Sequence, residues 1–224
     1  MKYILMMFKL FEKLIKTLAG AVETPMITES INGYDILQDS GKLVFAHGFM
    51  KSGNHALIKA LKLLGFWTAP VHIPFGTAIP TGYTHNIFIK RDPRNIMLSV
   101  MRIFKDASTP EALITSCKDL DYGGNGGENT KDFFEILNRW SGWLTDPNTF
   151  VVKFEDLIAS DAEMRRIAKY LKVPYKVGSF EKLPGDTATW NEEHTDYKDV
   201  WTQEVQDLWS SDAGTSLLIK WGYL

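Results

Sequence analysis

Short apolar runs alternate with helical periodicity along the middle of the chain. The apolar runs, each as long as a typical buried strand, are residues 42–47, 86–90 and 150–154. In the stretch after each run, apolar residues recur at spacings of three and four, as on one face of a helix. The order strand, helix, strand, helix, strand, helix predicts an α/β fold, in which crossover helices flank a parallel β-sheet.

Residues that begin or end helices mark the limits of the three predicted helices. Gly65 ends the first, and Asp92 followed by Pro93 supplies an N-cap residue and a proline at the first position of the second. The third is expected over residues 155–171, before Pro174. Two carboxylates in its first turn are expected to stabilise that helix end.

Residues 1–22 form a separate segment ahead of a single predicted domain over residues 23–224. Apolar positions in this segment share one helical face, and lysines lie elsewhere. Its early uncharged run, residues 3–8, is too short to span a bilayer and short for the apolar region of a secretory signal peptide. The amphipathic helix either packs on the domain or makes a weak membrane contact through residues 1–20. We expect a cytoplasmic protein.

Composition narrows the classes of function. The 224 residues are 45% hydrophobic, which is enough for one core. Lysine and arginine number 25 against 27 acidic residues, so nucleic-acid binding is not expected and any anionic ligand needs local donors. The single cysteine, Cys117, excludes an intramolecular disulfide and a multi-cysteine zinc site. No other cluster predicts a metal site.

The loop after the first strand is suited to a phosphate group. In parallel sheets, ligands bind outside the carboxyl ends of the strands. Lys51, Ser52 and Gly53 come directly before the next helix, whose first amides and dipole attract an anion. The alternative is a structural turn that binds nothing.

This loop departs from the phosphate loop of nucleoside triphosphatases. That pattern has two glycines separated by four residues, followed by lysine and then serine or threonine. Gly48 and Gly53 have this spacing, but Asn54 and His55 follow them. The hydroxyl that would bind Mg²⁺ is missing from its expected place, which disfavours a kinase.

A second candidate anion site follows the second strand. Arg91 comes directly after that strand, and Ser99 lies eight residues later, about two helical turns on. A guanidinium and a hydroxyl both bind phosphate, the first through charge-assisted hydrogen bonds. The alternative is a surface arginine beside an N-cap. Two anion sites on neighbouring strands predict a ligand with two separated anionic groups.

These loops resemble motifs of the sulfotransferases that use 3′-phosphoadenosine 5′-phosphosulfate. Residues 50–55, Met-Lys-Ser-Gly-Asn-His, are similar to the family's 5′-phosphosulfate loop, in which proline and two threonines replace the Met, Asn and His. Residues 91–99 resemble its 3′-phosphate motif, with arginine and serine at the same separation. Residues 152–157 resemble the family's Tyr-Glu-Asp-Leu segment. Residues 184–190 resemble its late Gly-Asp-Trp region more loosely. The resemblance covers about residues 42–200.

The resemblance implies a P-loop NTPase-like sulfotransferase fold and binding of this donor without a metal. The residues that it assigns to the donor are Lys51, Ser52, Gly53, Asn54, His55, Arg91 and Ser99. Ala56 stands where the cytosolic members have an aromatic residue that stacks on adenine.

Sulfuryl transfer to a hydroxyl or amine needs a base and a positive charge near the leaving phosphate. Lys51 is the candidate for the charge. His72 is the candidate base, because residues 70–74 resemble the family's Thr-His-Leu-Pro segment. The alternative is a packed loop histidine. His85 precedes the second strand and is expected at the opposite edge of the sheet, away from Arg91.

Aromatic residues flank this region of the sequence, and their roles stay open. Phe49, Phe66, Trp67 and Phe75 form either an aromatic wall for an acceptor or ordinary packing. The sequence therefore predicts a sulfotransferase with a small-molecule or carbohydrate acceptor. A P-loop kinase and a catalytically inactive anion-binding relative are the alternatives.

Overall fold

The computed structural model describes residues 44–66, 68, 72–77, 79, 83–103, 133–183, 197 and 201–224, with the backbone alone for residues 101–103. The expectations for residues 1–22, including membrane contact through residues 1–20, and for the motif at residues 184–190 lie outside these ranges. Within them, none of the helices combines the length and the apolar character that crossing a membrane requires.

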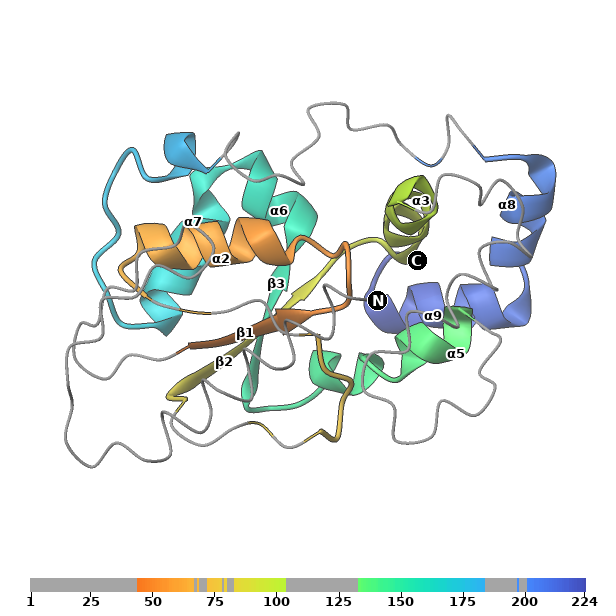
Figure 1. Cartoon of the computed structure of the whole chain (residues 1–224), viewed down its shortest axis with the longest axis horizontal. Coiled ribbons are helices and arrows are strands. Elements are labelled where there is room, and N and C mark those ends of the chain that lie inside the picture. Colours follow the sequence, from red (N-terminus) through yellow and green to blue (C-terminus); the bar gives the residue numbers. More distant parts are fainter. Residues whose placement is uncertain are drawn as a thin grey trace.

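Three parallel strands form the described sheet, in the order β1, β2, β3. Their bounds are Val44–Gly48, His85–Lys90 and Thr149–Lys153. Each strand is followed by a helix: α2 (Asn54–Leu63), α3 (Pro93–Ile103) and α6 (Phe154–Ala159), respectively (Figure 1). The predicted α/β fold, with helices flanking a parallel sheet, is confirmed.

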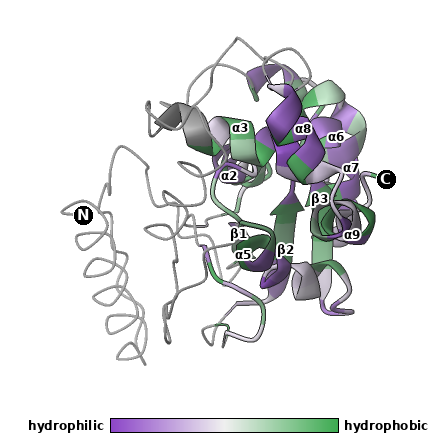
Figure 2. Ribbon diagram, turned by 90° about the vertical axis from the view of Figure 1, so that its right-hand side faces the viewer, coloured by the Kyte–Doolittle hydropathy of each residue, from purple (hydrophilic) through white to green (hydrophobic). Residues whose placement is uncertain are grey.

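Alternating side chains of the sheet enter two apolar cores. Ile87 and Ile89 pack with residues of α2, α6 and α7 (Asp161–Tyr170), whereas Phe88 between them packs into the core of the opposite face. That second core takes residues from α3, α5 (Phe133–Asn138), α8 (Gln203–Trp209) and α9 (Asp212–Trp221). Figure 2 shows green, hydrophobic stretches in the strands of the sheet, beside helices with hydrophilic, purple stretches. Burial on both faces explains why β2 is an apolar run in its middle.

The helix predicted over residues 155–171 is wrong as a single element. The structure divides it into α6 and α7, because Ser160 has an extended backbone with φ −163° and ψ 170°. Asp161 and Glu163 lie in the first turn of α7, where carboxylates stabilise a helix start, so a new helix begins there. Phe154, predicted as the end of the third strand, is instead the first residue of α6.

His47 belongs to the interior of the sheet. Its Nε2 donates to the amide oxygen of Asn86 on β2 over 2.7 Å, and the Asn86 amide donates to Thr149 Oγ1 on β3 over 2.7 Å. The side chain is fully buried, and burial lowers its pKa to about 4. His47 is therefore neutral at pH 7, and the Asn86 side chain links it to Thr149, so polar contacts join the three strands.

Candidate functional site

The loops that follow β1 and β2 meet at the carboxyl edge of the sheet. The guanidinium nitrogen Nη1 of Arg91 donates a hydrogen bond to the backbone oxygen of Lys51 over 3.2 Å. The two candidate anion sites are therefore neighbours, as expected when parallel strands end at the same edge. This placement suits one ligand that carries two anionic groups.

A tight turn connects β1 to α2. The amide and the hydroxyl of Ser52 both donate to the backbone oxygen of Phe49, over 3.1 and 2.6 Å. Lys51 and Gly53, on either side of Ser52, have positive φ angles of 66° and 103°. Ser52 is fully buried and shapes the turn through both of its donors. Its contact with a donor molecule stays a prediction.

Gly53 lies against the ring of Phe154, the first residue of α6. A Cβ atom at Gly53 would come within 2.3 Å of Phe154 Cδ2, far inside van der Waals contact. The left-handed backbone at this position is also unfavourable for any residue with a side chain. Only glycine satisfies both conditions, so the turn between β1 and α2 approaches α6 closely at this position.

We expect Gly53→Ala to lower the free energy of unfolding by about 3 kcal/mol, the sum of backbone strain and overpacking. Gly65→Ala is the matched control, because Gly65 also has a positive φ, of 84°, but has no atom within 4 Å of an added Cβ. The control should lose only the strain, about 1 kcal/mol. Urea unfolding of both variants measures the difference, and equal losses would contradict the close contact with Phe154.

The first two residues of α2 have different surroundings. The side-chain amide of Asn54 is buried and donates to the backbone oxygens of Phe49 and Gly48, over 3.0 and 3.3 Å. Asn54 therefore ties the start of α2 to the end of β1. His55 is partly exposed, and burial and then the charge of Lys51 lower its pKa. His55 thus lies within the electrostatic reach of Lys51.

Positive charge is concentrated around Lys51. Burial and, after it, the charge of Arg91 lower the pKa of the Lys51 ammonium below its ordinary value. The shift of the His55 pKa in the same direction has Lys51 as one of its causes. An anion bound between Lys51 and Arg91 would offset their mutual repulsion, so this place is electrostatically suited to a phosphate or sulfate group.

His72 lies beside the end of β1 with a defined ring orientation. Its Nδ1 is 2.8 Å from the backbone oxygen of Gly48. Since a carbonyl oxygen only accepts, Nδ1 carries the proton and Nε2 of the neutral ring carries the lone pair. Burial, partly offset by the hydrogen bond to Gly48, lowers the pKa of His72. At pH 7 the ring is therefore in the form that a general base requires.

The segment that carries His72 is anchored by the region before β3. The indole nitrogen of Trp143 donates to the backbone oxygen of Ile73 over 3.1 Å. The amide of Phe75 donates to the backbone oxygen of Arg139 over 2.8 Å. Trp143, in the 3-10 helix η1 (Ser141–Leu144), is buried and also holds this segment. Nothing in the sequence pattern indicated this second role.

The flanking aromatic residues separate into two groups. Phe49 and Phe66 are buried in the two cores, so packing explains both of them. Phe75 is 50% exposed and lies edge-on against Trp143, with ring centroids 5.1 Å apart. Trp67 lies outside the described residues.

The remaining candidates are Ser99, on α3, and His85, on β2. Ser99 is a partly exposed residue of α3, and its contact with a donor stays a prediction. His85 is the first residue of β2, where it packs edge-on against Tyr170, so it lies at the opposite edge of the sheet. In the described part of the chain, no group of three His, Cys, Asp or Glu side chains is arranged to hold a metal ion.

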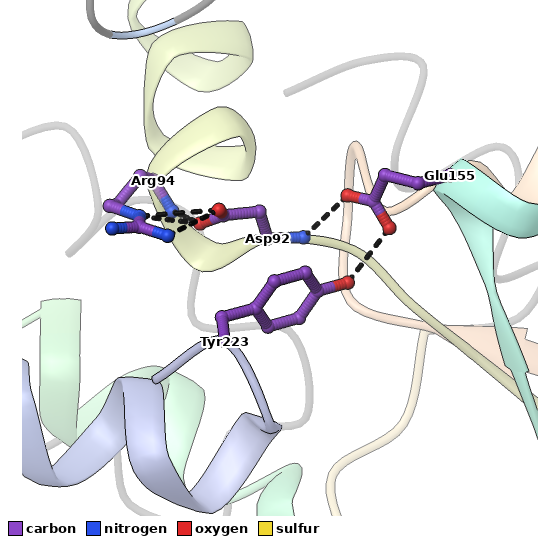
Figure 3. A network of polar contacts seen from close by, with 4 residues as sticks. All are labelled: Asp92, Arg94, Glu155 and Tyr223. Carbon is purple, nitrogen blue, oxygen red and sulfur yellow. Dashed lines mark hydrogen bonds and ion pairs between the residues drawn. The ribbon is translucent and has the colours of Figure 1, made fainter.

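Residues at the start of α6 contact Arg91 and the residue after it. The guanidinium of Arg91 lies over the ring of Phe154, 4.7 Å from its centroid. The carboxylate of Glu155 accepts a hydrogen bond from the amide of Asp92 over 2.9 Å (Figure 3). Glu155 does lie in the first turn of α6, as predicted, and it also binds the backbone next to Arg91. The motif at residues 152–157 was the only sign of it in the sequence.

Comparison with known proteins supports the fold alone. No model of a known protein family matches the sequence, and no curated protein matches it. Among solved structures, the chain is similar to the mouse sulfotransferase SULT7A1 complexed with PAP, with a TM-score of 0.55 and 15% sequence identity. The match covers 80% of this chain and 88% of that one. The fold is therefore sulfotransferase-like.

Proposed function

We propose that the protein is a sulfotransferase that moves a sulfuryl group from 3′-phosphoadenosine 5′-phosphosulfate to a hydroxyl or amine. The observation that carries this proposal is the contact of 3.2 Å between Arg91 and the backbone of Lys51. It brings the two anion loops to one place, next to His72, whose ring is held by Gly48 at the end of β1. The likeness to a sulfotransferase crystallised with PAP supports the same assignment.

The residues have distinct roles in the proposed step. Nε2 of His72 takes the proton of the acceptor hydroxyl, whose oxygen then forms a bond to sulfur. The bond between sulfur and the bridging oxygen of the donor breaks, and its electron pair stays on the 5′-phosphate. The ammonium of Lys51 stabilises the charge that develops on that phosphate. Arg91 and Ser99 are proposed to hold the 3′-phosphate.

The surroundings of Asn54 disfavour a kinase. Its side-chain amide stands where the P-loop pattern of nucleoside triphosphatases has its lysine, and it donates to the backbone oxygens of Gly48 and Phe49. Asn54 therefore supplies no positive charge to a triphosphate. His55 follows it in place of the hydroxyl that would bind Mg²⁺. We propose no metal requirement for the transfer.

We propose a small molecule or a carbohydrate as the acceptor. Phe75 is half exposed and its segment also carries His72, so a bound acceptor that packs on this ring would lie near the base. Cytoplasmic location stays a prediction.

Calorimetric titration with 3′-phosphoadenosine 5′-phosphate (PAP), the product of the donor, and with Mg·ATP tests the proposal. We expect saturable binding of PAP without Mg²⁺ and much weaker binding of Mg·ATP. Adenosine 5′-phosphate is the matched control ligand, since it lacks only the 3′-phosphate, and it should bind more weakly than PAP. Binding of Mg·ATP but not of PAP would overturn the assignment in favour of a kinase.

A further inference from the structure

One carboxylate joins the loop of Arg91 to the C-terminal end of the described chain. Glu155 Oε1 accepts from the amide of Asp92 over 2.9 Å, and Glu155 Oε2 accepts from the hydroxyl of Tyr223 over 2.8 Å (Figure 3). Arg94 holds the Asp92 carboxylate, with Nε 2.9 Å from Oδ1 and Nη2 2.7 Å from Oδ2. Hydrogen bonds therefore hold both the backbone and the side chain of Asp92.

Tyr223 is itself firmly placed. The ammonium groups of Lys90 and Lys153 lie 5.3 and 5.0 Å from the centroid of its ring. Lys90 also donates to the backbone oxygen of Trp221 over 2.6 Å, which fixes the end of α9 against the end of β2. Burial and the negative charge of Glu155 raise the pKa of Tyr223 well above its ordinary value. The phenol therefore remains a hydrogen-bond donor at any working pH.

Glu155, the hydrogen-bond partner of Tyr223, and Asp92, which bonds to Glu155, are both adjacent in sequence to residues of the candidate donor site. Asp92 directly follows Arg91. Glu155 directly follows Phe154, whose ring lies under the Arg91 guanidinium and against Gly53. Movement of the start of α6 would therefore shift the supports of both anion loops together.

We propose that Tyr223 is a positioning residue for the donor site, which through Glu155 holds the backbone next to Arg91 in the geometry for an anionic group. This inference rests on the proposed function for its ligand. Tyr223 is not among the residues assigned to the reacting atoms in the proposed step. Its effect should therefore appear in the affinity for the donor and not in the chemical step.

Tyr223→Phe removes only the hydroxyl, and Tyr170→Phe is the matched control. The Tyr170 hydroxyl also contacts the sheet, since it lies 3.5 Å from the backbone oxygen of Asn86, near the opposite edge. Two quantities are measured: the hydrogen-exchange rate of the Asp92 amide without ligand, and the Kd of PAP. In Tyr223→Phe we expect the exchange rate to rise several-fold and the Kd to rise about fivefold to tenfold. Neither should change in Tyr170→Phe.

The same substitution in a Glu155→Ala background tests the route of the effect. If Tyr223 acts through Glu155, Tyr223→Phe adds no further loss of affinity there. Unchanged exchange at Asp92, or faster exchange with an unchanged Kd, would overturn the positioning role. If the unsubstituted protein binds no PAP, the proposed function fails, and with it the role of Tyr223 in donor binding, while the exchange rate still tests the hydrogen-bonded link on its own.

Discussion

His72→Ala is expected to lower kcat for sulfuryl transfer by about a hundredfold to ten-thousandfold, the usual contribution of a general base. The Kd of PAP should stay nearly constant, because the phosphates are assigned to Lys51, Arg91 and the start of α2. Single-turnover kinetics with labelled donor measures the first quantity, and calorimetry measures the second. Loss of PAP binding in this variant would mean that His72 supports the donor loop.

The pH dependence of the transfer provides an independent check on His72. A base works only when it is unprotonated, so activity falls as the pH decreases through its pKa. Because burial lowers the pKa of His72, activity should persist at pH 6.5, the ordinary pKa of histidine, and be lost only below it. His85→Ala is the matched control, since His85 lies at the opposite edge of the sheet. It should leave both kcat and the pH profile unchanged.

The parts of the fold predicted correctly from the sequence are those with local causes. β1 and the middle of β2 are buried, and β3 is partly buried, so all three strands appear as short apolar runs. Pro93 is the first residue of α3, and Asp92 accepts hydrogen bonds from the first turn, as an N-cap residue does. The break at Ser160 was missed because the apolar spacing continues through it. The extended backbone at Ser160 ends α6 there, and the acidic residues after it stabilise the start of α7.

The parts of the site that the sequence did not predict depend on contacts between residues far apart along the chain. The carbonyl of Gly48 selects the tautomer of His72, and this choice depends on two loops packing together. The ring of Phe154 lies against both Gly53 and Arg91, because the carboxyl ends of the three parallel strands lie at the same edge of the sheet. Tyr223 reaches Glu155 across 68 positions of sequence, and no spacing rule predicts such a contact. The sequence indicated which side chains are candidates for binding an anion. It did not indicate which other residues hold those side chains in place.

Lys51→Ala is expected to reduce turnover by about a hundredfold to a thousandfold. Enzymes lose about this much in kcat when one group that stabilises developing negative charge in the transition state is removed. The Kd of PAP should also rise, because the same ammonium is assigned to the 5′-phosphate. The backbone oxygen of Lys51 accepts the hydrogen bond from Arg91, and alanine retains that oxygen. The variant therefore removes the charge while keeping this link between the loops.

Two further variants distinguish the charge of Lys51 from its position. Lys62→Ala removes an exposed lysine from the last turn of α2, so it lowers the net charge equally without touching the site. It should change neither turnover nor Kd. Lys51→Arg keeps the charge but spreads it over a planar group. If a compact ammonium must reach the bridging oxygen, Lys51→Arg restores PAP binding more fully than turnover. Normal turnover in Lys51→Ala would refute the assignment, because no positive charge would then be needed at the leaving phosphate from this loop.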